Sequence, residues 1–319
     1  PAQKVARWRW GKTTVSERYN ELVFKDGYIY TKNYKKDGAI ARSLLTEDRF
    51  GRTRTGKTEL ADLMGVQVFD NPKPTKLIQF LIAIASRESD FVMDFFAGSG
   101  TTGHAVMAQN AADGGNRRYI LVQLPEPLDP KDKDNKSLVA ICDEIGKPRN
   151  IAELTKERLR RASRKLKDEN PMFGGDLGFR VFKLDSTNIR EWDPKRDDLE
   201  GSLQMSIEHL KTDRTEQDIL YELLLKLGLD LCVPIETRKV AGKDVHSIGG
   251  GVLMTCLAQK ITRDDVEKLA TGIAEWRKGI APAGETTCVF RDSAFADDVA
   301  KTNLAAILNQ HGIANVRSL

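Results

Sequence analysis

The sequence lacks the features that mark several classes of protein. Its four cysteines are scattered through 319 residues without a Cys-x-x-Cys pair, which argues against a disulfide framework and a zinc site and favours a reducing cytoplasm. The longest nearly apolar run, 77–85, is interrupted by Gln79 and is far shorter than the roughly 20 residues of a membrane helix. No apolar signal sequence opens the chain. We therefore expect a globular cytoplasmic protein without a membrane partner.

Length and charge distribution are more informative. The chain is long enough for about two domains of ~150 residues, and its net charge of +4 is unevenly distributed. Residues 1–60 hold 14 basic and 7 acidic side chains together with eight aromatic rings. Cations neutralise phosphates and rings stack on bases, so this segment predicts a nucleic-acid contact, with a solvated β-rich segment as the alternative. The basic residues predicted to make the contact are Arg7, Arg9, Lys12, Lys35, Lys36, Arg52 and Arg54.

Hydrophobic periodicity and turn signals predict a mixed α/β chain. In the first part we expect a hairpin over 18–34, helices over 58–64, 75–86, 101–112 and 151–169, strands over 91–96 and 119–124, and a charged loop over 129–136. After a Pro/Gly break at 171–175 we expect strands over 178–185, 231–240, 244–248, 252–259, 286–291 and 313–318. The helices expected there are 203–211, 215–227, 263–277 and 296–311, the third of them with a capping-box pattern at Thr262 and Asp265.

Two glycine motifs are typical of nucleotide-binding loops. Residues 51–58 match the phosphate-binding pattern G-x-x-x-x-G-K-[ST], but the half-charged residues before them do not predict the buried strand that such a loop needs. Residues 98–103 match G-x-G-x-x-G and do lie between a predicted strand and a predicted helix. The second motif is the better candidate. A phosphate-loop NTPase that uses Lys57 and Thr58 remains an alternative.

Three motifs in a fixed order resemble those of a known family. They are residues 69–78 (FDNPKPTKLI), 94–102 (DFFAGSGTT) and 117–123 (RRYILVQ). Together they resemble the cofactor motifs of the amino-methyltransferases of DNA, in the arrangement in which the cofactor half follows the catalytic half. The string over 287–303 resembles the C-terminal region of the modification subunit of type III restriction–modification systems. The resemblance covers nearly the whole chain.

This resemblance implies a fold, a reaction and partners. The fold would be a partial Rossmann-like S-adenosylmethionine-dependent methyltransferase sheet with a second, C-terminal α/β domain. Residues 1–60 would end a target-recognition region, 61–175 would bind the cofactor, and 176–319 would serve assembly or partner binding. The reaction would be methyl transfer from S-adenosylmethionine to the exocyclic amine of adenine in a specific site of double-stranded DNA. The implied partners are the restriction subunit and a second copy in a homodimer.

The resemblance also implies roles for single residues. Asp94 would face the cofactor ammonium, Phe96 would pack against the cofactor, and the start of the N-P-K-P helix would lie beside its carboxylate. Gln123 stands where the family has an acid for the ribose hydroxyls, with Glu126 as the other candidate. The full predicted set is Asn71, Pro72, Lys73, Lys76, Asp94, Phe95, Phe96, Ala97, Gly98, Ser99, Gly100, Thr101, Thr102 and Gln123.

One family motif does not occur in the sequence. Amino-methyltransferases hold the target amine with a D-P-P-Y tetrapeptide, and the nearest strings here, at Asp70 and Asp129, lack the aromatic residue. In the family's order that motif would precede Pro1, and the chain does not start with Met. We therefore expect a C-terminal portion of a modification subunit, with no catalytic residue and no metal, that does not methylate DNA by itself. The alternative is a non-catalytic module that binds DNA or the restriction subunit.

Overall fold

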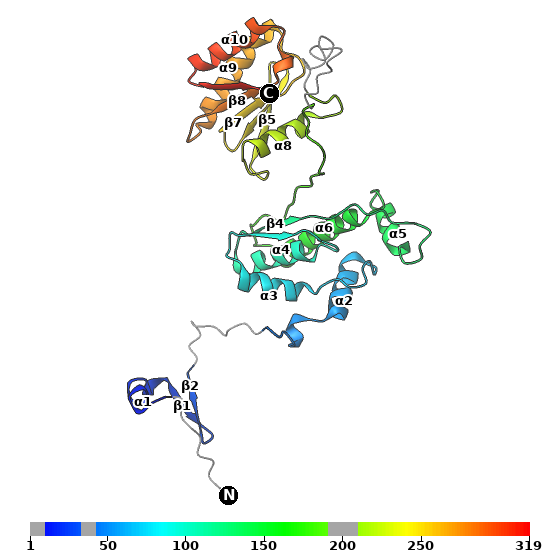
Figure 1. Ribbon diagram of the computed structural model, residues 1–319, viewed down its shortest axis with the longest axis vertical. Helices are drawn as coiled ribbons and strands as arrows, with labels where there is room; N and C mark the ends of the chain where they lie inside the picture. Colours follow the sequence, from blue (N-terminus) through cyan, green and yellow to red (C-terminus); the bar gives the residue numbers. More distant parts are fainter. Residues whose placement is uncertain (1–9, 33–42, 191–209) are drawn as a thin grey trace, which may run out of the picture. The chain divides into compact units, whose positions relative to one another are not determined.

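The computed structural model describes residues 10–32, 43–190 and 210–319. The chain divides into two compact units, Pro1–Phe179 and Arg180–Leu319 (Figure 1). Both units contain helices and strands, so the predicted mixed α/β class is confirmed. No helix in the described ranges is both long and apolar enough to cross a bilayer.

The predicted hairpin lies near the start of the chain. Helix α1 (Lys12–Glu17) and a 3-10 turn (Tyr19–Glu21) precede strands β1 (Leu22–Lys25) and β2 (Tyr28–Thr31), which pair in antiparallel fashion. Asp26 and Gly27 join the strands with φ angles of 54° and 77°, the left-handed conformation that a tight two-residue hairpin turn needs. The aromatic rings of this hairpin are largely exposed to solvent.

A parallel pair of strands forms the centre of the predicted cofactor half. Strands β3 (Phe91–Asp94) and β4 (Arg118–Leu121) are connected through helix α4 (Thr101–Asp113). Val92 and Tyr119 point to the face of the pair that packs against the helices, where Ile82, Ala105 and Val106 are buried. The helices that pack in this unit, besides α4, are α2 (Thr53–Met64), α3 (Thr75–Ala85), α5 (Lys136–Glu144) and α6 (Ile151–Glu169).

The other face of the β3–β4 pair is bare. Met93 and Ile120 are partners in the register and are 59% and 46% exposed, and Phe91 and Val122 are also exposed. Parallel sheets are normally covered on both faces, because their strands are rich in apolar residues. The exposed face therefore lacks a cover within the described residues of this unit.

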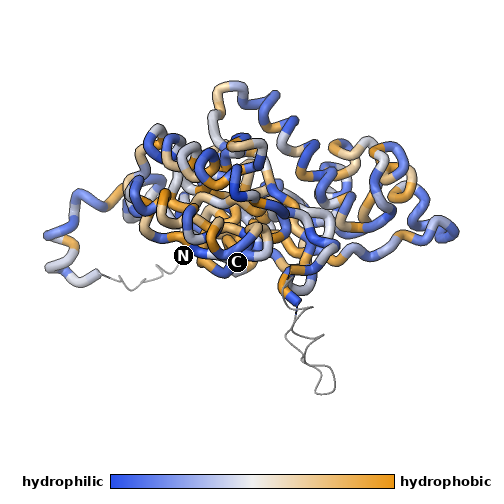
Figure 2. The backbone as a smooth tube through the Cα atoms, turned by 90° about the horizontal axis from the view of Figure 1, so that it is seen from above, coloured by the Kyte–Doolittle hydropathy of each residue, from blue (hydrophilic) through white to orange (hydrophobic). Residues whose placement is uncertain are grey.

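The second unit has a sheet that is covered on both faces. Its strands lie in the order β5 (Ile235–Val240), β6 (Lys243–Ile248), β7 (Leu253–Cys256), β8 (Thr287–Phe290), β9 (Asn315–Ser318), antiparallel up to β7 and parallel from there. Helices α9 (Arg263–Ile280) and α10 (Asp298–Gln310) bury one face, and α8 (Glu216–Lys226) packs on the other. The capping box of Thr262 and Asp265 is present. In Figure 2, hydrophobic stretches alternate with hydrophilic ones along the backbone.

Three secondary-structure expectations need correction. Helix α2 begins at Thr53 rather than at 58, because the Arg52 amide donates to the Thr55 hydroxyl (3.2 Å) and caps an earlier first turn. Helix α5 was not predicted beyond the charged loop. Residues 178–185 form no strand, because no neighbouring strand pairs with them; Leu184 is 99% exposed. Most of the helix expected over 203–211 lies outside the described residues.

Candidate cofactor site

Two of the predicted motifs meet at the carboxyl end of β3. The strand ends at Asp94, and residues 95–100 lead into α4, whose N-cap is Gly100 with a φ of 77°. The N-P-K-P segment reaches the same place, because the Thr101 hydroxyl donates to the carbonyl of Lys73 (3.4 Å). In open α/β sheets, ligands bind at the carboxyl ends of the strands. The structure thus places these two motifs together at the carboxyl end of β3.

The carboxylate of Asp94 is held in a fixed orientation at this end of β3. Its Oδ2 accepts a hydrogen bond from the Thr102 hydroxyl (2.6 Å), and its Oδ1 accepts one from the Phe96 amide (3.1 Å). Asp94 is half-buried, whereas the rings of Phe95 and Phe96 are 63% and 82% exposed. A half-buried carboxylate beside exposed rings suits a ligand that is both cationic and partly apolar.

Gly98 is held in place from two sides. Gln123 Oε1 accepts a hydrogen bond from the Gly98 amide (2.7 Å), and the Thr155 hydroxyl of α6 donates to the Gly98 carbonyl (2.5 Å). The other end of the Gln123 side chain donates to the Leu124 carbonyl (3.2 Å). In this structure Gln123 therefore shapes the glycine loop. Its predicted contact with a ribose, like that of Glu126, stays a prediction.

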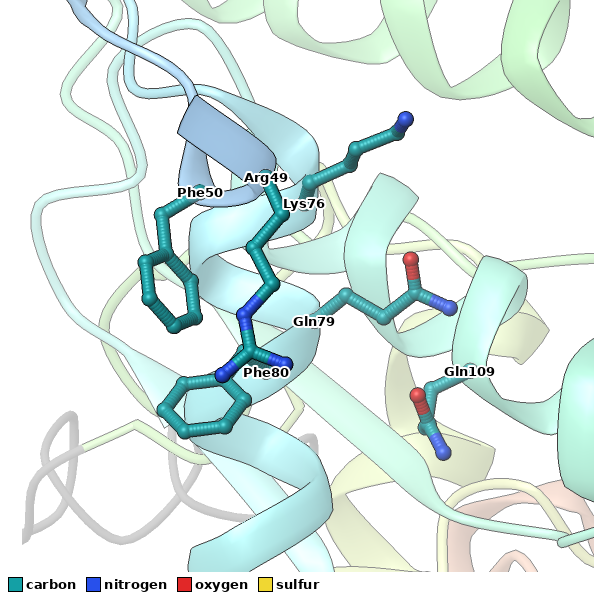
Figure 3. Close-up of a pocket in the computed structure, with 6 residues that line it drawn as sticks. All are labelled: Arg49, Phe50, Lys76, Gln79, Phe80 and Gln109. Atoms are coloured by element: carbon teal, nitrogen blue, oxygen red, sulfur yellow. The ribbon is translucent and has the colours of Figure 1, made fainter. Parts of the chain in front are cut away.

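The other predicted cofactor residues differ in exposure. Pro72, Ala97, Ser99, Gly100 and Thr101 are buried, whereas Asn71, Lys73 and Lys76 are exposed. Lys76 lines a hollow of about 230 Å³ (Figure 3) together with Arg49, Phe50, Gln79, Phe80 and Gln109. The Arg49 guanidinium lies 4.8 Å from the Phe50 ring centroid and 5.9 Å from that of Phe80. The Lys76 ammonium points away from both glutamines.

A buried polar network that the sequence motifs do not reveal lies below the glycine loop. Arg158 of α6 donates hydrogen bonds to Ser99, Thr101 and Thr75, and the Thr75 amide donates to Glu59 Oε2 (3.1 Å). One signal was available in the sequence. With a spacing of four residues, Arg158 falls between Leu154 and Ala162 on the apolar stripe of a predicted helix, where a long charged side chain must find partners.

The phosphate-loop motif is not a loop. Gly56, Lys57 and Thr58 lie inside helix α2, and the residues before the motif form a 3-10 turn (Asp48–Phe50) instead of a strand. The Lys57 ammonium lies 3.5 Å from Asp70 Oδ1. The strand–loop–helix context that phosphate binding requires is absent, so the interpretation of residues 51–58 as a phosphate-binding loop is wrong.

Gly56 has a packing role instead. A Cβ at this position would lie 2.4 Å from the Pro72 carbonyl oxygen and 2.9 Å from the Pro74 nitrogen. Alanine favours a helix by about 1 kcal/mol over glycine, but overpacking costs about 1–3 kcal/mol. We expect Gly56→Ala to lower the free energy of unfolding in urea by up to about 2 kcal/mol, with little change for Lys57→Ala as the control. Equal or greater stability of Gly56→Ala would contradict this packing.

His104 is buried next to the same network, with its Nδ1 3.5 Å from the Thr75 hydroxyl. Burial, and then the charges of Arg158 and Lys165, lower the pKa of His104 from 6.5 to about 3. The unfolded chain therefore binds the proton first, so the stability due to neutral His104 is fully present above pH 6.5 and lost as the pH falls toward 3. We expect NMR to show a neutral ring at pH 5, and His104→Gln to lose stability less steeply below pH 6.5. A ring that titrates near its ordinary pKa would contradict this assignment.

The predicted nucleic-acid residues are only partly described. Arg7, Arg9, Lys35 and Lys36 lie outside the described residues. Lys12 is exposed at the start of α1, and Arg54 is exposed in the first turn of α2. Arg52 is exposed too and lies 3.3 Å from Asp48. Their contact with DNA stays a prediction.

A glycine loop that leaves a parallel strand and opens a helix defines the class of nucleotide-type ligand sites. Residues 8–148 match the model of a family described as DNA methylase. This match agrees with the predicted resemblance to the amino-methyltransferases of DNA.

The chain is also similar to Mod subunits of type III restriction-modification enzymes. It is 40% identical to the StyLTI Mod subunit of Salmonella typhimurium over 137 residues, which are 43% of this chain and 20% of that protein. It is 29% identical to the EcoPI Mod subunit of Escherichia phage P1 over 282 residues (84% and 41%), and 32% identical to the EcoP15I Mod subunit of Escherichia coli over 248 residues (76% and 33%). The matched part thus spans less than half the length of these relatives, and the predicted resemblance to type III modification subunits is confirmed.

Proposed function

We propose that this chain binds S-adenosylmethionine at the carboxyl end of β3 and belongs to a site-specific DNA adenine methyltransferase, the modification subunit of a type III restriction–modification system. The hydrogen bond between Thr101 and Lys73, which joins the two cofactor motifs beside Asp94, carries this proposal. The described β3–α4–β4 unit would be part of a Rossmann-like methyltransferase sheet. The partners proposed with it are double-stranded DNA, the restriction subunit and a second copy of the chain.

Each proposed contact has a physical reason. Asp94 has a half-buried carboxylate at the carboxyl end of β3, and this group would accept hydrogen bonds from the ammonium of the cofactor. The first turn of α4 presents backbone amides, which suit the cofactor carboxylate, whereas the first amide of α3, that of Thr75, already donates to Glu59. The exposed rings of Phe95 and Phe96 would cover its apolar parts. When bound, S-adenosylmethionine supplies the methyl group; the chain's own residues bind and orient it.

The hairpin supports the proposed contact with DNA. Tyr19, Phe24, Tyr28 and Tyr30 are each more than half exposed. Groups of exposed apolar side chains mark binding sites in many proteins, and stacking on bases is one use for such rings within a basic segment. We therefore keep residues 1–60 as the proposed end of a target-recognition region, 61–175 as the cofactor-binding half and 176–319 as the unit for assembly or partner binding.

The experiment that tests the proposal is a calorimetric titration of the purified chain with S-adenosylmethionine. We expect saturable binding with a stoichiometry of about one cofactor per chain, because the chain has one proposed site, at the carboxyl end of β3.

A further inference from the structure

Arg158 is the most deeply buried charged side chain near the candidate site. It is 1% exposed, and none of the described residues forms an ion pair with its guanidinium. Burial lowers its pKa to about 10, so the group still carries its charge at neutral pH. A buried charge that forms no ion pair is costly unless hydrogen bonds compensate it, even though the charge of Glu59 partly offsets the effect of burial on the pKa of Arg158. The partners of Arg158 therefore indicate what it is for.

Those partners lie on both cofactor motifs. Nη1 donates to the hydroxyls of Ser99 (2.8 Å) and Thr101 (2.7 Å) in the glycine loop. Nη2 donates to the hydroxyl of Thr75 (3.2 Å), the first residue of α3. The Nε atom has no hydrogen-bond partner, so the guanidinium is oriented by its two Nη atoms.

We infer that Arg158 is the positioning residue of the cofactor site, whose guanidinium fixes the glycine loop against the first turn of α3 before the cofactor binds. Without it, the direct link between the two motifs is the Thr101–Lys73 hydrogen bond, which at 3.4 Å is long. A planar guanidinium donates in two fixed directions at once, which the ammonium of a lysine does not reproduce. The inference rests on the proposed cofactor site and adds a residue outside its motifs.

The test compares Arg158→Met and Arg158→Lys with Arg161→Met in the full 1–319 chain. Arg161 lies on the same helix and is partly buried, but it donates to the Met64 carbonyl (2.7 Å) and to Glu157 (2.8 Å), away from both cofactor motifs. Hydrogen exchange without cofactor should rise over 97–102 and 73–77 in both Arg158 variants and stay at the wild-type level in Arg161→Met. The Kd for S-adenosylmethionine should rise about tenfold or more in both Arg158 variants, as for the loss of a charge-assisted hydrogen bond.

A second comparison separates positioning from a general loss of stability. Thr75→Val removes the hydroxyl that accepts from Arg158 Nη2. Adding it to Arg158→Lys should therefore raise the Kd less than the sum of the two separate changes predicts. Wild-type exchange rates and Kd in Arg158→Lys, or strictly additive losses with Thr75→Val, would overturn the inference. If the wild-type chain itself bound no S-adenosylmethionine, the proposed cofactor site would fail; wild-type binding with unchanged Arg158 variants would reject only the role of Arg158.

Discussion

Replacing Asp94 with alanine should weaken binding of S-adenosylmethionine by about 10- to 100-fold, the range for losing a hydrogen bond between two charged groups. Asp94 ends β3, and its carboxylate is the one negatively charged group in that motif. Both carboxylate oxygens already accept one hydrogen bond each, so the side chain does not have to be ordered when the ligand arrives. Isothermal calorimetry measures the affinity directly.

The matched control for this substitution is Asp90→Ala. Asp90 lies just before β3, at the opposite end of the strand, and its carboxylate also accepts a backbone hydrogen bond, from Arg87 (2.8 Å). We expect this variant to bind S-adenosylmethionine with the wild-type Kd. Equal affinities of wild type and Asp94→Ala would place the ammonium elsewhere and would contradict the site described here.

The second large effect concerns methyl transfer itself. Because no D-P-P-Y tetrapeptide occurs in the sequence, the purified 1–319 chain should transfer no methyl group from labelled S-adenosylmethionine to DNA. We expect transfer when a polypeptide that carries the catalytic half of a type III modification subunit is added. The bare face of β3 and β4 is the surface that such a half would cover, since parallel strands are stable when both faces are buried.

Substitutions on that face provide the specific test. Met93→Lys and Ile120→Lys should leave the isolated chain folded, because both side chains are about half exposed, and should prevent activation by the added half. Met172→Lys is the control, since Met172 is 96% exposed outside this face. Methyl transfer by the isolated chain would contradict the proposal that it lacks the catalytic groups. Undiminished activation of Met93→Lys and Ile120→Lys would show that the catalytic half binds elsewhere.

Local patterns in the sequence predicted most elements of both units. Helix α6 was predicted over its observed range because its apolar residues recur at helical spacing, and β7 and β8 were found because buried strands are short, mostly apolar runs. Residues 178–185 show the limit of this reasoning. Alternating residues fit a strand, but a strand also needs a neighbour to pair with, and local sequence does not reveal the neighbour.

The candidate site was predictable only in part for a similar reason. The motifs predicted which segments would meet, because strand, loop and helix follow one another in the sequence around Asp94. The network of Arg158, Thr75 and His104 depends on contacts between segments far apart in the chain. Residues 51–58 match the sequence pattern of a phosphate-binding loop but do not form one. Gly56 packs closely against Pro72 from within a helix, and the pattern does not reveal this contact.

The central claim is that S-adenosylmethionine binds at the end of β3, and calorimetric titration of the purified 1–319 chain with S-adenosylmethionine and with ATP tests it most directly. We predict binding of S-adenosylmethionine in the micromolar range, about −8 kcal/mol, and no heat of binding with ATP. Binding of ATP without binding of S-adenosylmethionine would contradict the claim. Silence with both ligands would contradict the claim that residues 1–319 form the cofactor site by themselves.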